Sequence, residues 1–149
     1  MSKKQQVLFI CTGNSARSQM AEAILKRYAG NQFDVRSAGL EPKGINPFTV
    51  RVMEEAGYDM SGHQSKSLRE FMGYTHSRYV ITVCGHADAS CPRGLWSSGQ
   101  KLHWPFEDPA AFEGSDEDKL AKFRQIRDQI DQKILSWLEE IEIVPQLHE

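Results

Sequence analysis

The sequence predicts an α/β fold: a four-stranded parallel sheet with helices on both faces. Two observations support this. Short segments of strand length alternate along the chain with longer segments that have the composition or periodicity of helices. The most apolar short segments, residues 7–10 and 79–83, are nearly continuous runs, which is typical of parallel strands that are covered on both sides.

The first strand, first helix and second strand follow one another closely. The apolar run 7–10 has the length of a buried strand and ends at a polar loop. Residues 18–25 are rich in good helix formers, and we expect this helix to end near Gly30. Residues 33–38 alternate apolar and polar side chains, which predicts a strand at the edge of the sheet.

A second helix is expected after the turn-rich residues 39–44. Asn46 offers an N-cap, Pro47 suits the first helical position, and Gly57 should end the helix. The apolar run 79–83 is the clearest buried strand of the chain.

The last strand and the last helix complete the alternation. Residues 101–104 predict a weaker fourth strand, and a long helix opens at Ser115 with acidic residues in its first turn, where the helix dipole favours them. Its apolar side chains form one stripe, which predicts that it docks on the sheet. The stripe consists of Leu120, Phe123, Ile126, Ile130, Ile134, Trp137, Leu138 and Ile141.

Composition excludes several classes of protein. With 149 residues, of which 40% are hydrophobic and 26% charged, the sequence fits one domain spanning residues 1–149. A net charge of −2 argues against a nucleic-acid-binding protein, and no stretch approaches the length of a membrane span. Three cysteines without a signal peptide favour reactive thiols in the cytoplasm over a secreted disulfide scaffold. We expect a monomer.

The loop between the first strand and the first helix predicts a catalytic oxyanion site. Its backbone N–H groups and the start of the helix attract an anion, and Arg17 adds a planar charged fork. Cys11 would lie beneath that anion as a nucleophilic thiolate. A cysteine or an arginine alone is usually structural, but the two six positions apart, with Gly13 between them, favour function. The oxyanion-binding residues are expected to be Thr12, Gly13, Asn14, Ser15, Ala16, Arg17 and Ser18.

With this Cys-x5-Arg-Ser loop near its start, the chain resembles the low-molecular-weight tyrosine phosphatase superfamily, and more closely its arsenate reductase branch, over about residues 6–138. The resemblance implies a low-molecular-weight phosphatase-like, flavodoxin-like sheet. It also implies that Asn14 and Ser18 hold the loop and hydrogen-bond the thiolate. Ala16 departs from the many relatives that carry a second cysteine at this position.

Two more cysteines bear on the choice between hydrolysis and reduction. The segment from Cys84 to Cys91 resembles the redox segment of thioredoxin-coupled arsenate reductases, which use three cysteines. A flexible or partly helical segment could bring the two sulfurs together, and glycines and serines at 85, 94 and 97–99 suggest that this segment is mobile. The alternatives are a core Cys84 with an incidental loop Cys91, or a zinc site that adds His86 and His103.

Asp108 matches the acid with which this superfamily protonates the leaving oxygen, although an Asp-Pro pair is also common in turns. Tyrosine phosphatases of the family follow this pair with aromatic residues that hold a phenolic substrate. Here Ala110, Ala111 and Phe112 follow, and a small inorganic anion would not need the missing tyrosines.

These observations predict an arsenate reductase in which Cys11, Arg17, Cys84, Cys91 and Asp108 are catalytic. Arsenate would be the substrate, with phosphate and sulfate competing, and thioredoxin the reductant; no cofactor or metal is expected. The leading alternative is a tyrosine phosphatase or small phosphomonoesterase that uses Cys11, Arg17 and Asp108 alone. A non-catalytic thiol sensor for arsenite or a soft metal would leave Arg17 and Asp108 without a purpose.

The resemblance also concerns a cation. Some arsenate reductases of the family hold potassium near the loop, and Asn14, Glu22 and Ser37 match three of the residues that do so. Lys66 stands at the fourth position, where those relatives have an aspartate. Because a lysine ammonium is itself a monovalent cation, we expect little dependence of activity on potassium.

Overall fold

The computed structural model describes residues 4–71, 77–91 and 99–146. Within these residues four parallel strands form one sheet in the order β2-β1-β3-β4. The strands are β1 (Gln5–Cys11), β2 (Phe33–Gly39), β3 (Ser77–Thr82) and β4 (Gln100–His103). The predicted parallel sheet is therefore confirmed, with the segment around residues 33–38 at its edge.

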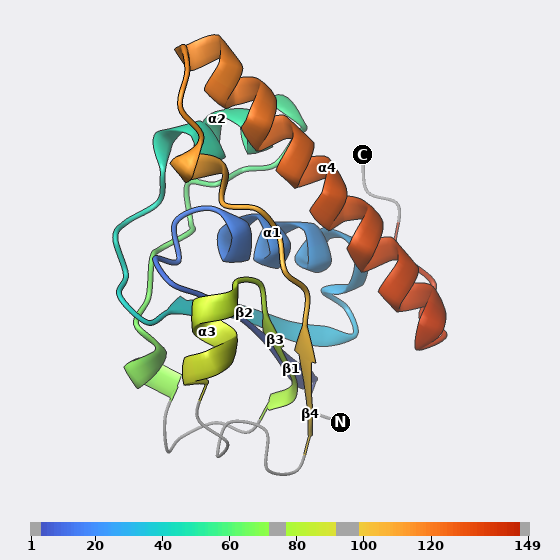
Figure 1. Cartoon of the computed structure of the whole chain (residues 1–149). Helices are drawn as coiled ribbons and strands as arrows, with labels where there is room; N and C mark the ends of the chain where they lie inside the picture. The colour runs from blue at the N-terminus through green and yellow to red at the C-terminus, as the bar shows by residue number, and fades with distance from the viewer. Residues whose placement is uncertain (1–3, 72–76, 92–98, 147–149) are drawn as a thin grey trace.

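Helices cover the sheet on both sides. Figure 1 shows α1 (Arg17–Ala29), α2 (Pro47–Glu55) and α4 (Asp116–Glu140) gathered on one side, and the short α3 (Gly85–Ser90) on the other. Two 3-10 turns, η1 (Leu68–Phe71) and η3 (Pro109–Ala111), complete the described elements. The Asn46 side chain caps α2 by accepting from the Phe48 backbone N–H, and Ser115 forms a capping box with Asp118 at α4.

The centre of the core lies at β1 and at the apolar stripe of α4. Residues 7–10 of β1 have no exposed surface, and all seven stripe residues within α4 are buried; the eighth, Ile141, is the C-cap of the helix. Trp137 of α4 lies against Tyr79 and Trp104, with ring centroids 5.0 and 5.4 Å apart. Each fully buried Leu, Ile or Phe side chain of the core contributes about 1.5–3 kcal/mol. This packing holds α4 against the sheet, as the stripe predicts.

The register brings the candidate residues to one edge of the sheet. Cys11 pairs with Gly39 of β2, and Thr82 of β3 pairs with His103 of β4. Because the strands are parallel, their carboxyl ends and the loops that leave them share one edge, where ligands bind in such sheets.

One detail differs from the sequence analysis, because Cys11 is the last residue of β1 rather than the first of the loop. The segment after Cys84, expected to be flexible or partly helical, forms a short helix. The glycine and serines expected to be mobile at 94, 97 and 98 lie outside the described residues. Among those described, no helix is both long and apolar enough to span a bilayer.

Candidate active site

The turn from β1 into α1 places Cys11 under a tight loop of five residues. Asn14 adopts a left-handed conformation, with φ at 48°, so the backbone doubles back within this short distance. The backbone N–H of Asn14 then points at the Cys11 sulfur, 3.2 Å away. The backbone of β2 runs close by, and a Cβ on Gly39 would lie 2.7 Å from the carbonyl oxygen of Thr12.

The Cys11 sulfur receives a second hydrogen bond from Ser18. The two side-chain atoms are 2.8 Å apart, and the Asn14 Nδ2 donates to the same Ser18 oxygen at 2.8 Å. With Asn14 donating to its oxygen, the Ser18 hydroxyl keeps its own proton available for Cys11. The Cys11 sulfur, in a residue that is 2% exposed, therefore lies within hydrogen-bond distance of the Asn14 backbone N–H and of the Ser18 hydroxyl.

Arg17 and Asp108 lie next to each other at the same pocket. The pocket, of roughly 450 Å³, is lined by Cys11, by the loop up to Arg17, and by Asp108. Arg17 Nη1 donates to the Phe106 carbonyl at 3.0 Å, and its Nη2 lies 3.8 Å from Asp108 Oδ2. The Asp108 carboxylate also accepts from the Ala110 N–H, so it caps η3 while it lines the pocket. The residues predicted as nucleophile, cation and acid thus line one pocket.

The other two cysteines stand at the two ends of α3. Cys84 is the N-cap, and its sulfur lies 3.3 Å from the Thr12 hydroxyl, one residue along from Cys11. Cys91 is the C-cap, half-buried and packed against the core. Burial raises the pKa of the Cys91 thiol to about 11. All three cysteines are free thiols.

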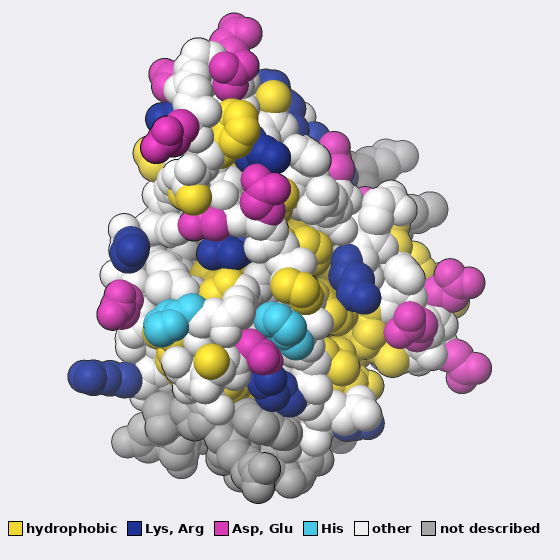
Figure 2. Space-filling model, in the orientation of Figure 1, with side chains coloured by type: hydrophobic (Ala, Val, Ile, Leu, Met, Phe, Trp, Pro, Cys, Tyr) yellow, Lys and Arg dark blue, Asp and Glu magenta, His cyan; other side chains and the backbone are white. Residues whose placement is uncertain are grey.

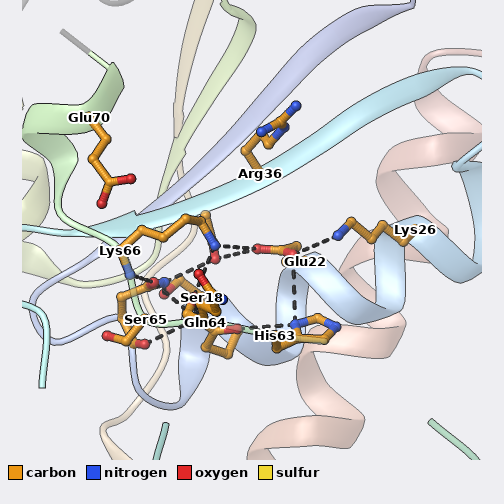
Figure 3. Close-up of polar contacts among 12 residues, drawn as sticks. Ser18, Glu22, Lys26, Arg36, His63, Gln64, Ser65, Lys66 and Glu70 are labelled. Atoms are coloured by element: carbon orange, nitrogen blue, oxygen red, sulfur yellow. Dashed lines mark hydrogen bonds and ion pairs between the residues drawn. The ribbon is translucent and has the colours of Figure 1, made fainter. Parts of the chain in front are cut away.

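A buried carboxylate, Glu22 of α1, lies behind the loop (Figure 3). Its Oε1 accepts from the Ser37 hydroxyl at 2.5 Å, and Asn14 Nδ2 donates to that same hydroxyl at 3.0 Å. This chain of hydrogen bonds connects Glu22 through Asn14 and Ser18 to Cys11.

Three basic side chains surround Glu22. Lys26 Nζ lies 2.8 Å from its Oε2, Lys66 Nζ 3.8 Å from its Oε1, and His63 Nδ1 3.7 Å from its Oε2 (Figure 3). The pKa of His63 is lowered, first by burial, which Glu22 partly opposes. The ammonium of Lys66 therefore stands beside the group of Asn14, Glu22 and Ser37.

Several residues around the loop could not be found from the sequence. The buried amide of Gln19 donates to the carbonyl and the side chain of Asn14, at 3.2 and 3.0 Å. Ser65 donates to the Gly13 carbonyl, and Lys43 lines the pocket. The only sequence feature that could have indicated one of them is the position of Gln19 directly after the loop. Ser65 and Lys43 come from segments that are distant in sequence.

No group of three or more His, Cys, Asp or Glu side chains within the described ranges is arranged to hold a metal ion. Of the residues in the zinc alternative, His103 instead lies 2.8 Å from the Thr82 hydroxyl.

The chain is similar to known proteins along most of its length. Residues 6–145 match the family model described as low molecular weight phosphotyrosine protein phosphatase. An arsenate reductase of Halalkalibacterium halodurans is 44% identical over 136 residues, which cover 91% of this chain and 96% of that protein. An arsenate reductase solved in a phosphate-binding state superposes with a TM-score of 0.74 at 32% identity, over 92% of this chain and 98% of the other. A thioredoxin-dependent arsenate reductase of Corynebacterium glutamicum gives a TM-score of 0.71 at 33% identity, over 95% of this chain and 63% of that one.

Proposed function

The chain belongs to the low molecular weight phosphotyrosine protein phosphatase family, and we propose that it is an arsenate reductase that works by a three-cysteine relay and is reduced by thioredoxin. The observation that carries the proposal is the placement of Cys84. Its sulfur lies 3.3 Å from the hydroxyl of Thr12, beside the pocket that contains Cys11, Arg17 and Asp108. A hydrolase would not need a second thiol there.

The first half of the proposed reaction forms a bond between sulfur and arsenic. Arsenate binds in the loop 12–18 against Arg17, where phosphate and sulfate would compete. Positive groups fixed in advance are often the largest single contribution to catalysis. The Cys11 thiolate, held by Ser18 and the Asn14 N–H, attacks arsenic. Asp108 gives a proton to the departing hydroxyl, which leaves as water.

The second half transfers two electrons. Cys84, as its thiolate, attacks the Cys11 sulfur; the sulfur–arsenic bond breaks and its electron pair goes to arsenic, which leaves as arsenite. A Cys11–Cys84 disulfide remains. Cys91 then attacks Cys84 by thiol–disulfide exchange, and this frees Cys11 and leaves a Cys84–Cys91 disulfide. Thioredoxin supplies the two electrons that reduce this last disulfide.

The proposal includes the setting of the reaction. A cycle that depends on reduced thioredoxin requires a reducing compartment, and we place the enzyme in the cytoplasm. All groups of the proposed relay come from one chain, so it should act as a monomer with one domain spanning residues 1–149.

The experiment is arsenate-dependent oxidation of NADPH in the presence of thioredoxin and thioredoxin reductase. Wild type should turn over, and Cys84→Ser and Cys91→Ser should not. Cys91→Ser should stop with Cys11 bound to Cys84, which peptide mass mapping detects. Cys11→Ser should abolish every activity.

Phosphate protection of Cys11 from alkylation serves as the control, because it requires only an intact loop. Cys84→Ser and Cys91→Ser should retain this protection. A Cys91→Ser enzyme with full turnover would refute the relay.

The hydrolase alternative has its own support, because Cys11, Arg17 and Asp108 share one pocket and suffice for phosphate ester hydrolysis. Aryl phosphate hydrolysis that survives both substitutions, without any arsenate turnover, would make the protein a phosphatase.

A further inference from the structure

One carboxylate ties the helix α3 to the sheet. Asp88, in the middle of α3, accepts hydrogen bonds from Lys101 of β4 and, at 3.1 Å, from the hydroxyl of Thr82 of β3. His103 Nδ1 lies 3.7 Å from the same oxygen and 2.8 Å from the Thr82 hydroxyl. Lys101 is the first cause that lowers the pKa of Asp88, so this carboxyl is ionised at neutral pH. Figure 2 shows basic, acidic and histidine side chains together on the face over α3 and β4.

The helix keeps Cys84 and Cys91 apart. The two residues cap opposite ends of α3, seven positions from each other, which at about 1.5 Å per residue separates them by roughly 10 Å. A disulfide requires Cα atoms about 4.4–6.8 Å apart. A Cys84–Cys91 disulfide can therefore form only after α3 has uncoiled.

The folded helix is also what the first exchange needs. The Asp88 N–H bonds to the Cys84 carbonyl at 3.1 Å, and the Ala87 N–H points at the Cys84 sulfur. Ala87 is fully buried, which fixes the first turn of α3 beneath that sulfur. These contacts hold the Cys84 thiol beside Thr12, the residue that follows Cys11 in the loop.

The attack of Cys84 on Cys11 must therefore come before the opening of α3. If α3 opened before arsenate had reacted, a peroxide could oxidise the Cys84 and Cys91 thiols to a disulfide and be reduced to water, and the two electrons meant for arsenic would be lost. Cys11 would then hold its arsenic adduct without a thiol to resolve it.

We propose that Asp88, through Lys101 and Thr82, is a positioning residue for the relay: it latches α3 to the ends of β3 and β4 until Cys84 has attacked Cys11. The proposal rests on the relay described above. Asp88 touches neither the anion pocket nor a reacting sulfur, and it acts through the helix that carries both cysteines.

The raised pKa of the Cys91 thiol while α3 is folded agrees with the role proposed for Asp88. Burial is the main cause of its raised pKa; the charge of Asp88 raises this pKa further, and that of Lys101 lowers it. Opening the helix removes the burial and takes Asp88 away from Lys101. Cys91 then becomes a better nucleophile at the step that requires it.

The test is amide hydrogen exchange of the peptide 84–91 in the reduced enzyme, without arsenate or thioredoxin. Asp88→Asn and Lys101→Met each break the ion pair with little change of shape. Because both side chains are partly exposed, at 33% and 24%, exchange should become about three- to tenfold faster in each variant. The double variant should be no faster than either single one, since both changes remove the same interaction.

Glu113→Gln is the matched control, because it removes one exposed negative charge far from α3 in sequence. It should exchange like wild type. In a single turnover with arsenate, Asp88→Asn should also form the Cys84–Cys91 disulfide several-fold faster than wild type after Cys84 has been oxidised.

Unchanged exchange of residues 84–91 in both single variants overturns the latch, even where wild type completes the relay. Additive acceleration in the double variant overturns the pairing of Asp88 with Lys101. A wild type that never forms the Cys84–Cys91 disulfide overturns the relay, and the latch with it.

Discussion

Replacing Gly39 by alanine should damage the oxyanion loop without touching a catalytic side chain. A Cβ at this last residue of β2 would lie 2.7 Å from the Thr12 carbonyl oxygen and 2.8 Å from the Asn14 backbone nitrogen. A Cβ atom in a folded protein essentially never lies closer than 3.0 Å to such an atom, so the loop must move by at least ~0.3 Å. Both neighbours are backbone atoms, which cannot rotate out of the way as the end of a side chain can. Overpacking of this kind costs about 1–3 kcal/mol of stability.

The activity of Gly39→Ala should fall further than its stability. The Asn14 N–H that must move donates to the Cys11 sulfur at 3.2 Å. A misplacement of up to about 1 Å at a reacting centre can cost on the order of 10²-fold in rate. The measurement is kcat/KM for arsenate in the thioredoxin-coupled assay, beside denaturant unfolding of the same sample.

Gly62→Ala is the control, because no heavy atom of the described residues lies within 4 Å of the Cβ it would add. It should keep wild-type activity and be unchanged or slightly more stable, since alanine restricts the unfolded chain. A Gly39→Ala enzyme with wild-type kcat/KM would show that the loop tolerates the displacement, and would refute the reasoning.

Three further predictions follow from the site. Asp108→Asn should slow the first chemical step at least tenfold in single-turnover kinetics while leaving phosphate binding within about twofold, because in the proposed mechanism Asp108, which lines the pocket, supplies a proton rather than the anion cradle. Replacing sodium by potassium at constant ionic strength should leave the rate within about twofold, because Lys66 already places an ammonium 3.8 Å from Glu22; a several-fold rise would contradict this. Between about pH 9 and 11 the unfolded chain releases the Cys91 proton while the folded protein, with a pKa of about 11, keeps it. The free energy of unfolding of wild type should therefore fall by up to about 1.4 kcal/mol per pH unit more than that of Cys91→Ser, as measured by urea denaturation.

The fold could be predicted well because its signals are local. Asn46 with Pro47, and Ser115 with its acidic first turn, mark helix starts through bonds to residues two or three positions away. The apolar run of β1 indicated a strand buried on both faces for an equally local reason. The short α3 was less clear, since six residues carry too little periodicity to distinguish a helix from a loop.

The site could be predicted only in part. Cys11 and Arg17 flank one short loop, so that a single local turn brings them to the same pocket and the sequence could predict their proximity. Gly39 and Glu22 support that loop from a neighbouring strand and from the next turns of α1, and their roles depend on packing that no short pattern encodes. Asp108 caps η3, which confirms the turn interpretation of its Asp-Pro pair, and it also faces Arg17 in the pocket, while its role as the acid stays a prediction.

The same pocket can serve reduction and hydrolysis, and the central atom of the anion decides between them. In the proposed mechanism both reactions begin with Cys11 attacking a tetrahedral oxyanion, and both leave a sulfur adduct beside Cys84. For Cys84 to displace that adduct, the departing atom must accept an electron pair. Arsenic(V) does this readily, whereas phosphorus(V) does not and must wait for water. Hydrolysis of a phosphate ester should therefore be indifferent to Cys84, and arsenate turnover should depend on it entirely, although one loop binds both anions.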